Sequence, residues 1–397
     1  MKKSHMLMYA ALVCLWPSAQ VARAADDEAR IKELERRVQQ LEAGAPAAPA
    51  MSHSGMSGMD AALSGPGVPL HGFADVGGGF RQHGESGFTT GSFDIYVTPQ
   101  FSDRVRALAE ALIEFGEDTG EPGIDLERMQ IGYAFSDTFT IWLGRFHSPF
   151  GYYNTAFHHG QLMQTSIKKP KFLDFEDSGG VMPSHTVGTW ATGAFRLGSN
   201  NKITYDVYVG NSPTIKGGGL DMRNLSSANH TASRGLNLAY QGLGGSFRLG
   251  GHYYRASVVD DAVPANDTKL SFMGPYAVFD DGVWEVMYEY YRWNNENIVS
   301  NTAAPLGEHR STAWFGQLGR HFGQWMPYAR YEKASFNQDD NFFAALAGGR
   351  SYSRKLAGVR YDINPRAAFT VEYYHTEQDD LVVPNYNTMR FQFAIGF

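Results

Sequence analysis

The sequence predicts an all-β protein, a transmembrane antiparallel β-barrel of about 16 strands with a short N-terminal coiled-coil helix. Three observations support this class. Between residues 71 and 397, segments of about ten residues alternate apolar and polar side chains, which gives a strand one apolar and one polar face. Short turns and longer loops alternate along this region. Glycine (44 residues) and aromatic residues (14%) are abundant, which favours many strands and turns.

Composition excludes two other classes of protein. The chain has 397 residues and a mean hydropathy of −0.34. No stretch after residue 24 approaches the ~18 apolar residues that a membrane-spanning helix needs. The formal net charge is −7, and it becomes more negative if Lys2, Lys3 and Arg23 are removed. A nucleic-acid partner is therefore not expected.

Residues 1–24 have the pattern of an export signal. Lys2 and Lys3 precede a short apolar core over residues 6–16, and residues 22–24 read Ala-Arg-Ala, a small-x-small cleavage site. The alternative is a retained membrane anchor, for which the apolar run is too short. Cys14 is the only cysteine and lies within this signal. The processed chain would therefore form no disulfide and no thiolate metal site.

Residues 25–43 predict the coiled-coil helix. Ile31, Leu34, Val38 and Leu41 follow one another at spacings of three, four and three, which forms an a/d seam over two heptads. Two repeats of arginine, apolar, two others, apolar and glutamate resemble a pattern of trimeric coiled coils. This seam predicts a homotrimer, and the alternative is a solvated amphipathic helix or a frayed tail.

Residues 44–70 read as a flexible linker rich in Ala, Pro, Gly, Ser and Met. Within it, Met51, His53, Met56 and Met59 bring thioether and imidazole groups together, and such groups suit copper. The run resembles, in miniature, the Met/His-rich segments of outer-membrane copper-resistance proteins. Weak copper binding is the only cofactor interaction expected, and a low-complexity linker is the alternative.

Residues 71–397 predict the barrel itself. Residues 105–115 show the pattern: Arg106, Glu110 and Glu114 share one face, and the odd-numbered residues form an apolar face. The sixteen strands are expected to begin near residues 71, 88, 104, 125, 139, 186, 202, 233, 246, 268, 283, 310, 325, 352, 366 and 387. Short turns are expected at 102–103, 136–138, 199–201, 244–245, 280–282, 323–324 and 364–366, and long loops at 155–185, 211–232, 295–309 and 337–351.

The signal, the coiled coil, the sixteen segments and the terminal Phe397 together resemble the bacterial outer-membrane porins, in particular the phosphate-selective group. The resemblance implies a location in the outer membrane of a Gram-negative bacterium, surrounded by its lipid. It also implies a water-filled channel for passive diffusion of small hydrophilic solutes or ions. In this family a terminal aromatic, here Phe397, acts as the signal for the barrel-assembly machinery, and the long loop after the fifth strand narrows the channel.

The loop over residues 155–185 therefore contains the candidate pore constriction. Its lysines could attract anions at close range, and the alternative is a solvated surface loop of mixed charge. The adjacent His158 and His159 are weak candidates for a metal site, because neighbouring side chains of a strand point to opposite faces. The constriction candidates are Lys168, Lys169, Lys171, Asp174, Glu176 and Asp177.

Charged residues of both signs fall on the polar faces of the strands and are expected to line the lumen. They would form either a selective eyelet or salt-bridged filler that satisfies a polar interior, because a register error of one residue exchanges the faces. These candidates are Arg106, Glu110, Glu114, Arg128, Arg248, Glu285, Glu289, Arg330, Arg360, Glu372 and Arg390.

An enzyme is not expected, since the sequence has no nucleophile-elbow and no metalloprotease helix motif. The primary prediction is a passive porin. Two alternatives remain: a barrel that handles metal, most plausibly copper through residues 51–59, and a structural barrel that houses a partner protein.

Overall fold

A computed structural model describes residues 70–397 except 85, 116–121, 158–160, 177–178, 229, 301 and 380–384. The predicted signal, the coiled-coil seam and the Met/His run lie outside the described residues. In the described part of the chain, no helix has both the length and the apolar character needed to cross a membrane.

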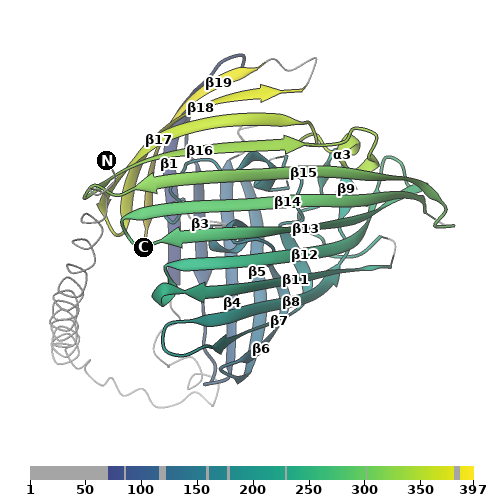
Figure 1. Ribbon diagram of the computed structural model, residues 1–397, viewed down its shortest axis with the longest axis horizontal. Coiled ribbons are helices and arrows are strands. Elements are labelled where there is room, and N and C mark those ends of the chain that lie inside the picture. Colours follow the sequence, from purple (N-terminus) through teal and green to yellow (C-terminus); the bar gives the residue numbers. More distant parts are fainter. Residues whose placement is uncertain are drawn as a thin grey trace, which may run out of the picture. The chain divides into compact units, whose positions relative to one another are not determined.

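Sixteen strands form a closed antiparallel ring, which confirms the all-β sixteen-stranded barrel of the predicted fold class (Figure 1). Neighbours in the ring are neighbours in the chain, and β19 returns to pair with β1. The strands of the ring are β1 (Leu70–Arg81), β3 (Ser92–Val97), β4 (Val105–Phe115), β5 (Pro122–Ser136), β6 (Phe139–His147), β7 (His185–Arg196), β8 (Lys202–Asn211), β11 (Ala232–Gly242), β12 (Phe247–Asp260), β13 (Asn266–Asp280), β14 (Trp284–Val299), β15 (Pro305–Arg320), β16 (Trp325–Ser335), β17 (Tyr352–Asn364), β18 (Ala367–Gln378) and β19 (Tyr386–Gly396).

Short strands and helices lie in the connections between the strands of the ring. The strands β2 (Gly87–Thr89) and β3 both pair with β1. Residues 77–79 of β1 pair with β2, and residues 70–74 pair with β3. The loop between β8 and β11 contains β9 (Thr214–Lys216) and β10 (Gly219–Leu220). The helices are short: α2 (Tyr153–Ala156), η2 (Lys171–Leu173), η3 (Leu243–Gly245) and α3 (Asn341–Ala345).

Hydrogen bonds between the first and last strands close the ring. The register runs from Phe73 opposite Gly396 to Arg81 opposite Thr388. Beyond it, the N–H of Gly72 donates to the carbonyl of Phe397 and the N–H of Phe397 donates back, both at 3.0 Å. Among the described residues, this pairing removes the free edges that the first and last strands of the ring would otherwise have.

One predicted loop is wrong. Residues 295–309 were expected to be a long loop, but β14 continues to residue 299 and β15 begins at residue 305. The polar residues there resemble the sequence of a turn, yet the side-chain amides of Asn295 and Asn297 face the interior. Asn295 Nδ2 donates to Asp340 Oδ2 at 2.8 Å, and Asn297 Nδ2 donates to the Asp339 carbonyl at 3.2 Å. Partners from the β16–β17 loop therefore satisfy polar side chains within regular strands.

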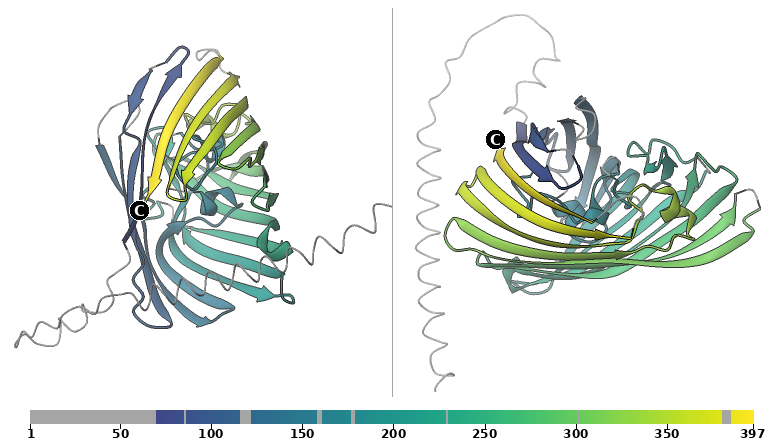
Figure 2. Two further views of the ribbon diagram at one scale, coloured as in Figure 1. Left: turned by 90° about the vertical axis from the view of Figure 1, so that its left-hand side faces the viewer. Right: turned by 90° about the horizontal axis from the view of Figure 1, so that it is seen from above.

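The two faces of the strands differ as the period-two pattern predicts. The outward residues Leu236, Leu238 and Met273 are exposed and apolar. The interior contains a segment of the chain as well as side chains, and Figure 2 shows blue-teal coil within the ring of strands. This segment joins β6 to β7 and is the long connection that the sequence predicts.

Candidate functional site: an inward-folded loop

We call residues 148–184, which connect β6 to β7, the inner loop. Its two ends are joined at the barrel wall, because the N–H of Ser148 donates to the Ser184 carbonyl at 2.8 Å. Asn154 Nδ2 donates to the same carbonyl at 3.2 Å and to the Ser148 carbonyl at 2.9 Å. The loop therefore leaves and re-enters the sheet at one point, and its middle reaches across the interior.

Wall carboxylates bind the backbone of the inner loop. Glu289 Oε1 accepts from the N–H groups of Tyr152 and Tyr153 at 2.9 and 2.6 Å. Glu372 Oε2 accepts from the N–H of Ile167 at 2.9 Å. These contacts fix the loop backbone at Tyr152, Tyr153 and Ile167 to the strands β14 and β18.

A third carboxylate and its neighbours continue this binding. Glu332 Oε2 accepts from the N–H of Lys171 at 2.6 Å, and from the hydroxyl of Tyr352 at 2.8 Å. That hydroxyl oxygen also accepts from the N–H of Phe172 at 3.0 Å. The start of η2 is thereby fixed against β16 and β17.

Arginine side chains bind the carbonyl and hydroxyl oxygens of the loop in the same way. Arg330 donates to Ser166 Oγ at 2.7 Å and to the Lys169 carbonyl at 3.1 Å. Arg360 Nη1 donates to the Gln164 carbonyl at 2.6 Å. Five side chains predicted to line the lumen thus bind the loop instead of facing open water, and so does Glu332. The five are Glu285, Glu289, Arg330, Arg360 and Glu372.

Aromatic packing covers the wall beneath the first part of the loop. The ring of Phe150 lies 5.4 Å from that of Phe272, and Phe172 lies 5.3 Å from Tyr291. Offset and edge-to-face rings of this kind stabilise a contact beyond the area they bury. The inward faces of β13 and β14 thus carry buried aromatic rings for the loop, beside the charged residues that the sequence predicts for the lumen.

The lysines of the loop occupy different environments. Lys169 is only 5% exposed and its ammonium lies 3.3 Å from the centre of the Phe175 ring. Lys168 and Lys171 are half-buried, and burial lowers the pKa of Lys171 below its usual range. Lys168 interacts electrostatically with Asp75 on β1. Only two of the three predicted lysines therefore reach partly open space.

Arginines and tyrosines alternate on the wall that faces these lysines. Arg81 lies 4.2 Å from the centre of the Tyr386 ring, and Arg354 Nη2 donates to the Tyr386 hydroxyl at 3.4 Å. Arg354 also lies 4.5 Å from the Tyr374 ring, whose hydroxyl accepts from Arg390 Nε at 3.3 Å. We call Arg81, Arg390, Lys168 and Lys171 the basic track. Arg354 lies behind it, because its side chain is buried and its Nη1 lies 3.7 Å from Glu332 Oε1.

The remaining predicted residues lie outside this track. Asp174 is half-buried, Glu176 is buried against His185, and Asp177 lies outside the described residues. Arg248 lies over the ring of Tyr152 at 5.2 Å, and Arg128 pairs with Glu110. Arg106 is exposed and Glu114 is half-buried on β4.

Sequence reasoning missed a buried cluster where the inner loop meets the wall. His147 ends β6 and His185 begins β7, and the two are paired in register. Glu127 on β5 completes the group. The pairing of the two histidines could have been predicted, because residues that flank a long connection between adjacent strands lie opposite each other. The inward position of Glu127 could not be predicted from the sequence. A β-bulge brings it to the same face as Arg128, and the period-two pattern does not reveal a bulge.

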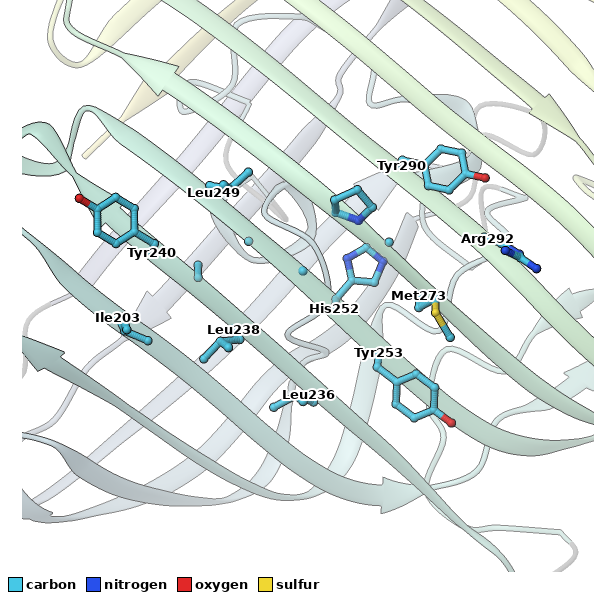
Figure 3. A pocket seen from close by; sticks show the side chains of 15 residues that line it. Ile203, Leu236, Leu238, Tyr240, Leu249, His252, Tyr253, Met273, Tyr290 and Arg292 are labelled. Carbon is cyan, nitrogen blue, oxygen red and sulfur yellow. The ribbon is translucent and has the colours of Figure 1, made fainter.

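The outer face has an apolar hollow of its own. A cavity of about 800 Å³ lies over β11–β13 where Gly250, Gly251 and Gly274 carry no side chain. Leu236 and Met273 line its rim, as Figure 3 shows. Because it opens on the outward face of the strands, it does not belong to the interior site.

No protein-family model and no curated protein matches the sequence. Solved structures match the fold. An anion-selective porin from Comamonas acidovorans is 12% identical, with a TM-score of 0.56, covering 83% of this chain and 99% of its own. OmpF of Salmonella typhi is 13% identical, with a TM-score of 0.56 and coverages of 83% and 97%. OmpT of Vibrio cholerae in its trimer form is 11% identical, with a TM-score of 0.51 and coverages of 83% and 99%. The chain therefore has the closed sixteen-stranded barrel fold of these porins.

Proposed function

We propose that the chain forms a water-filled channel in the outer membrane of a Gram-negative bacterium, through which small hydrophilic solutes or ions diffuse passively. The inner loop is the observation that carries this proposal. A sixteen-stranded barrel is wide enough for an aqueous channel, and the loop narrows it while remaining fixed to β14–β18.

The charge on the part of the inner wall that faces the lysines of the loop favours anions. The basic track places four cationic side chains on the loop and on the facing strands β1 and β19. Glu332 and Glu372 are fully buried. Glu332 is paired with Arg330 and Arg354 at 3.5 and 3.7 Å, and Glu372 accepts from a backbone N–H of the loop, so both have partners of their own within the wall. Rings of cationic side chains select for anions, and one structure of similar fold is described as an anion-selective porin.

Planar-bilayer recording under a KCl gradient tests the proposal. The folded chain without residues 1–24 should give discrete conductance steps and a reversal potential whose sign indicates selectivity for anions. Lys168→Gln with Lys171→Gln should shift the reversal potential toward cations. Lys355→Gln is the matched control, because Lys355 is exposed on the opposite face of β17. Absence of steps from folded protein would refute the channel, and an unchanged reversal potential in the double variant would refute the role of the track.

We also propose a homotrimer, joined in part by the seam of Ile31, Leu34, Val38 and Leu41. A structure of similar fold is described in a trimer form, and the arginine–glutamate pattern supports the same state here. Crosslinking of the folded protein should give trimers, and deletion of residues 25–43 should weaken them. Only monomers from the intact chain would contradict the trimer.

A further inference from the structure

The wall of the barrel holds a group of three buried side chains with metal-ligand chemistry. The candidate ligand atoms of Glu127, His147 and His185 all lie within 4.8 Å of one another. Each residue comes from a different strand, β5, β6 and β7. A site built on adjacent strands of a sheet holds its ligands more firmly than one built on loops.

Local backbone geometry explains how the three converge. Glu110 pairs with Arg128 and Ala111 pairs with Leu126, so Glu127 is the extra residue of a β-bulge. The bulge turns Glu127 inward beside Arg128, where a regular strand would turn one of them outward. His147 and His185 are direct cross-strand partners, which brings their side chains into contact range.

The next layer of contacts orients the histidine rings. Glu176 of the inner loop accepts from the N–H of His185 at 3.0 Å and lies 3.1 Å from its Nδ1. This contact directs His185 Nε2 at Glu127 Oε2, 2.6 Å away. His147 Nε2 lies 3.7 Å from Glu110 Oε2. A carboxylate behind a histidine is the arrangement that fixes the tautomer of a metal-binding imidazole.

The charges of the cluster favour a cation. Three buried carboxylates, those of Glu110, Glu127 and Glu176, meet here. Two guanidinium groups, those of Arg128 and Arg145, compensate part of the charge. Buried charges are stable only when they are paired or coordinated, so the cluster with neutral histidines has a net negative charge that a cation would compensate.

We infer that Glu127, His147 and His185 bind one divalent transition-metal ion of the Zn²⁺ class, which ties the end of the inner loop to the wall through Glu176. Two imidazoles and one carboxylate form a ligand set that Zn²⁺ favours. The opposing arrangement is a metal-free one, in which a protonated histidine supplies the positive charge itself.

Cobalt spectroscopy separates the two arrangements. The folded chain without residues 1–24 is titrated with Co²⁺, whose visible absorption is strong only at a low-coordinate protein site. The chain then has no cysteine, so no thiolate band interferes. We expect absorption that saturates at one ion per chain and disappears when Zn²⁺ is added. The weak spectrum of hydrated Co²⁺ alone would overturn the inference without any variant.

Two variants locate the ion. His147→Gln with His185→Gln should weaken Co²⁺ binding at least tenfold, and E127Q should weaken it as well. The matched control replaces Met51, His53, Met56 and Met59 together and should leave the absorption unchanged. Loss of the absorption in this control alone would place the ion in the linker and overturn the assignment. Bilayer conductance of the same proteins reports separately on the channel.

Discussion

At the scale of single residues, the inner loop depends on close approach to the wall. Gly151 has a φ of +61°, and a Cβ there would collide with the hydroxyl of Tyr291 and a carboxylate oxygen of Glu289. The Gly151 carbonyl also accepts from Asn237 Nδ2 at 2.9 Å. Glycine at this position therefore serves both the backbone conformation and the seating of the loop.

Gly151→Ala should destabilise the protein more than the same change at Gly244. Both residues have positive φ, but a Cβ at Gly244 would meet nothing within 4 Å. The left-handed conformation costs alanine about 1–2 kcal/mol at either site, and overpacking adds about 1–3 kcal/mol at Gly151. Urea unfolding in lipid vesicles measures the two free energies. Equal losses would show that the loop does not pack against Glu289 and Tyr291.

The proposed anion preference should decline at alkaline pH earlier than an ordinary lysine predicts. Burial lowers the pKa of Lys171 from 10.5, so its charge is present below that lowered pKa and is lost as pH rises through it. Reversal potentials recorded from pH 7 upward measure the effect. Lys171→Arg should remove this early decline, since guanidinium stays charged. The same pH profile in both proteins would assign the decline to another group.

At the scale of elements, the inner loop is the part that we propose sets the width of the channel. Its position could be predicted, because a connection of this length after the fifth strand stood out in the sequence. Its contacts could not be predicted. Which of Glu285, Glu289, Glu332 and Glu372 faces water and which accepts from a backbone N–H depends on the path of the loop, and no local pattern encodes that path.

Replacing residues 161–175 with a short Gly-Ser linker should increase single-channel conductance severalfold. This change removes the segment that Arg330, Glu332 and Glu372 hold across the interior. The control is the same replacement of residues 262–265, an exposed turn between β12 and β13. A conductance that is equal in both proteins would mean that the inner loop does not limit the flow.

The strands themselves illustrate what a period-two pattern can determine. It locates most strands and their faces, since successive side chains of a strand point to opposite sides of the sheet whatever its partners. It fails at residues 295–299, where Asn295 and Asn297 mimic a turn but have partners on the neighbouring loop. It also fails at Glu127, because one inserted residue changes the face without interrupting the alternation on either side.

At the scale of the whole molecule, the ring closes through pairing between the first and last strands. Phe397 exchanges two backbone hydrogen bonds with Gly72, and its ring stacks on Phe93 at 5.9 Å. Contacts between residues so far apart in sequence form late in folding, because they close the largest loop of the chain.

Phe397→Ala and deletion of Phe397 should separate two roles of this residue. The alanine variant keeps both backbone bonds and loses the ring, so refolding into detergent should be nearly normal. If the ring is also read by the assembly machinery, insertion into the outer membrane of cells should fall for both variants. Heat-dependent mobility on gels measures folded protein in each case. Normal insertion of the alanine variant would contradict a signalling role for the ring.

The wall recognises the backbone of the inner loop at Tyr152, Tyr153, Ile167 and Lys171, and every amino acid except proline supplies the same N–H group. The course of the loop is therefore largely independent of the side chains at these points. Substitutions elsewhere on the loop can alter which solutes pass while its route is preserved. Such an arrangement allows selectivity to evolve by point mutation without rebuilding the barrel.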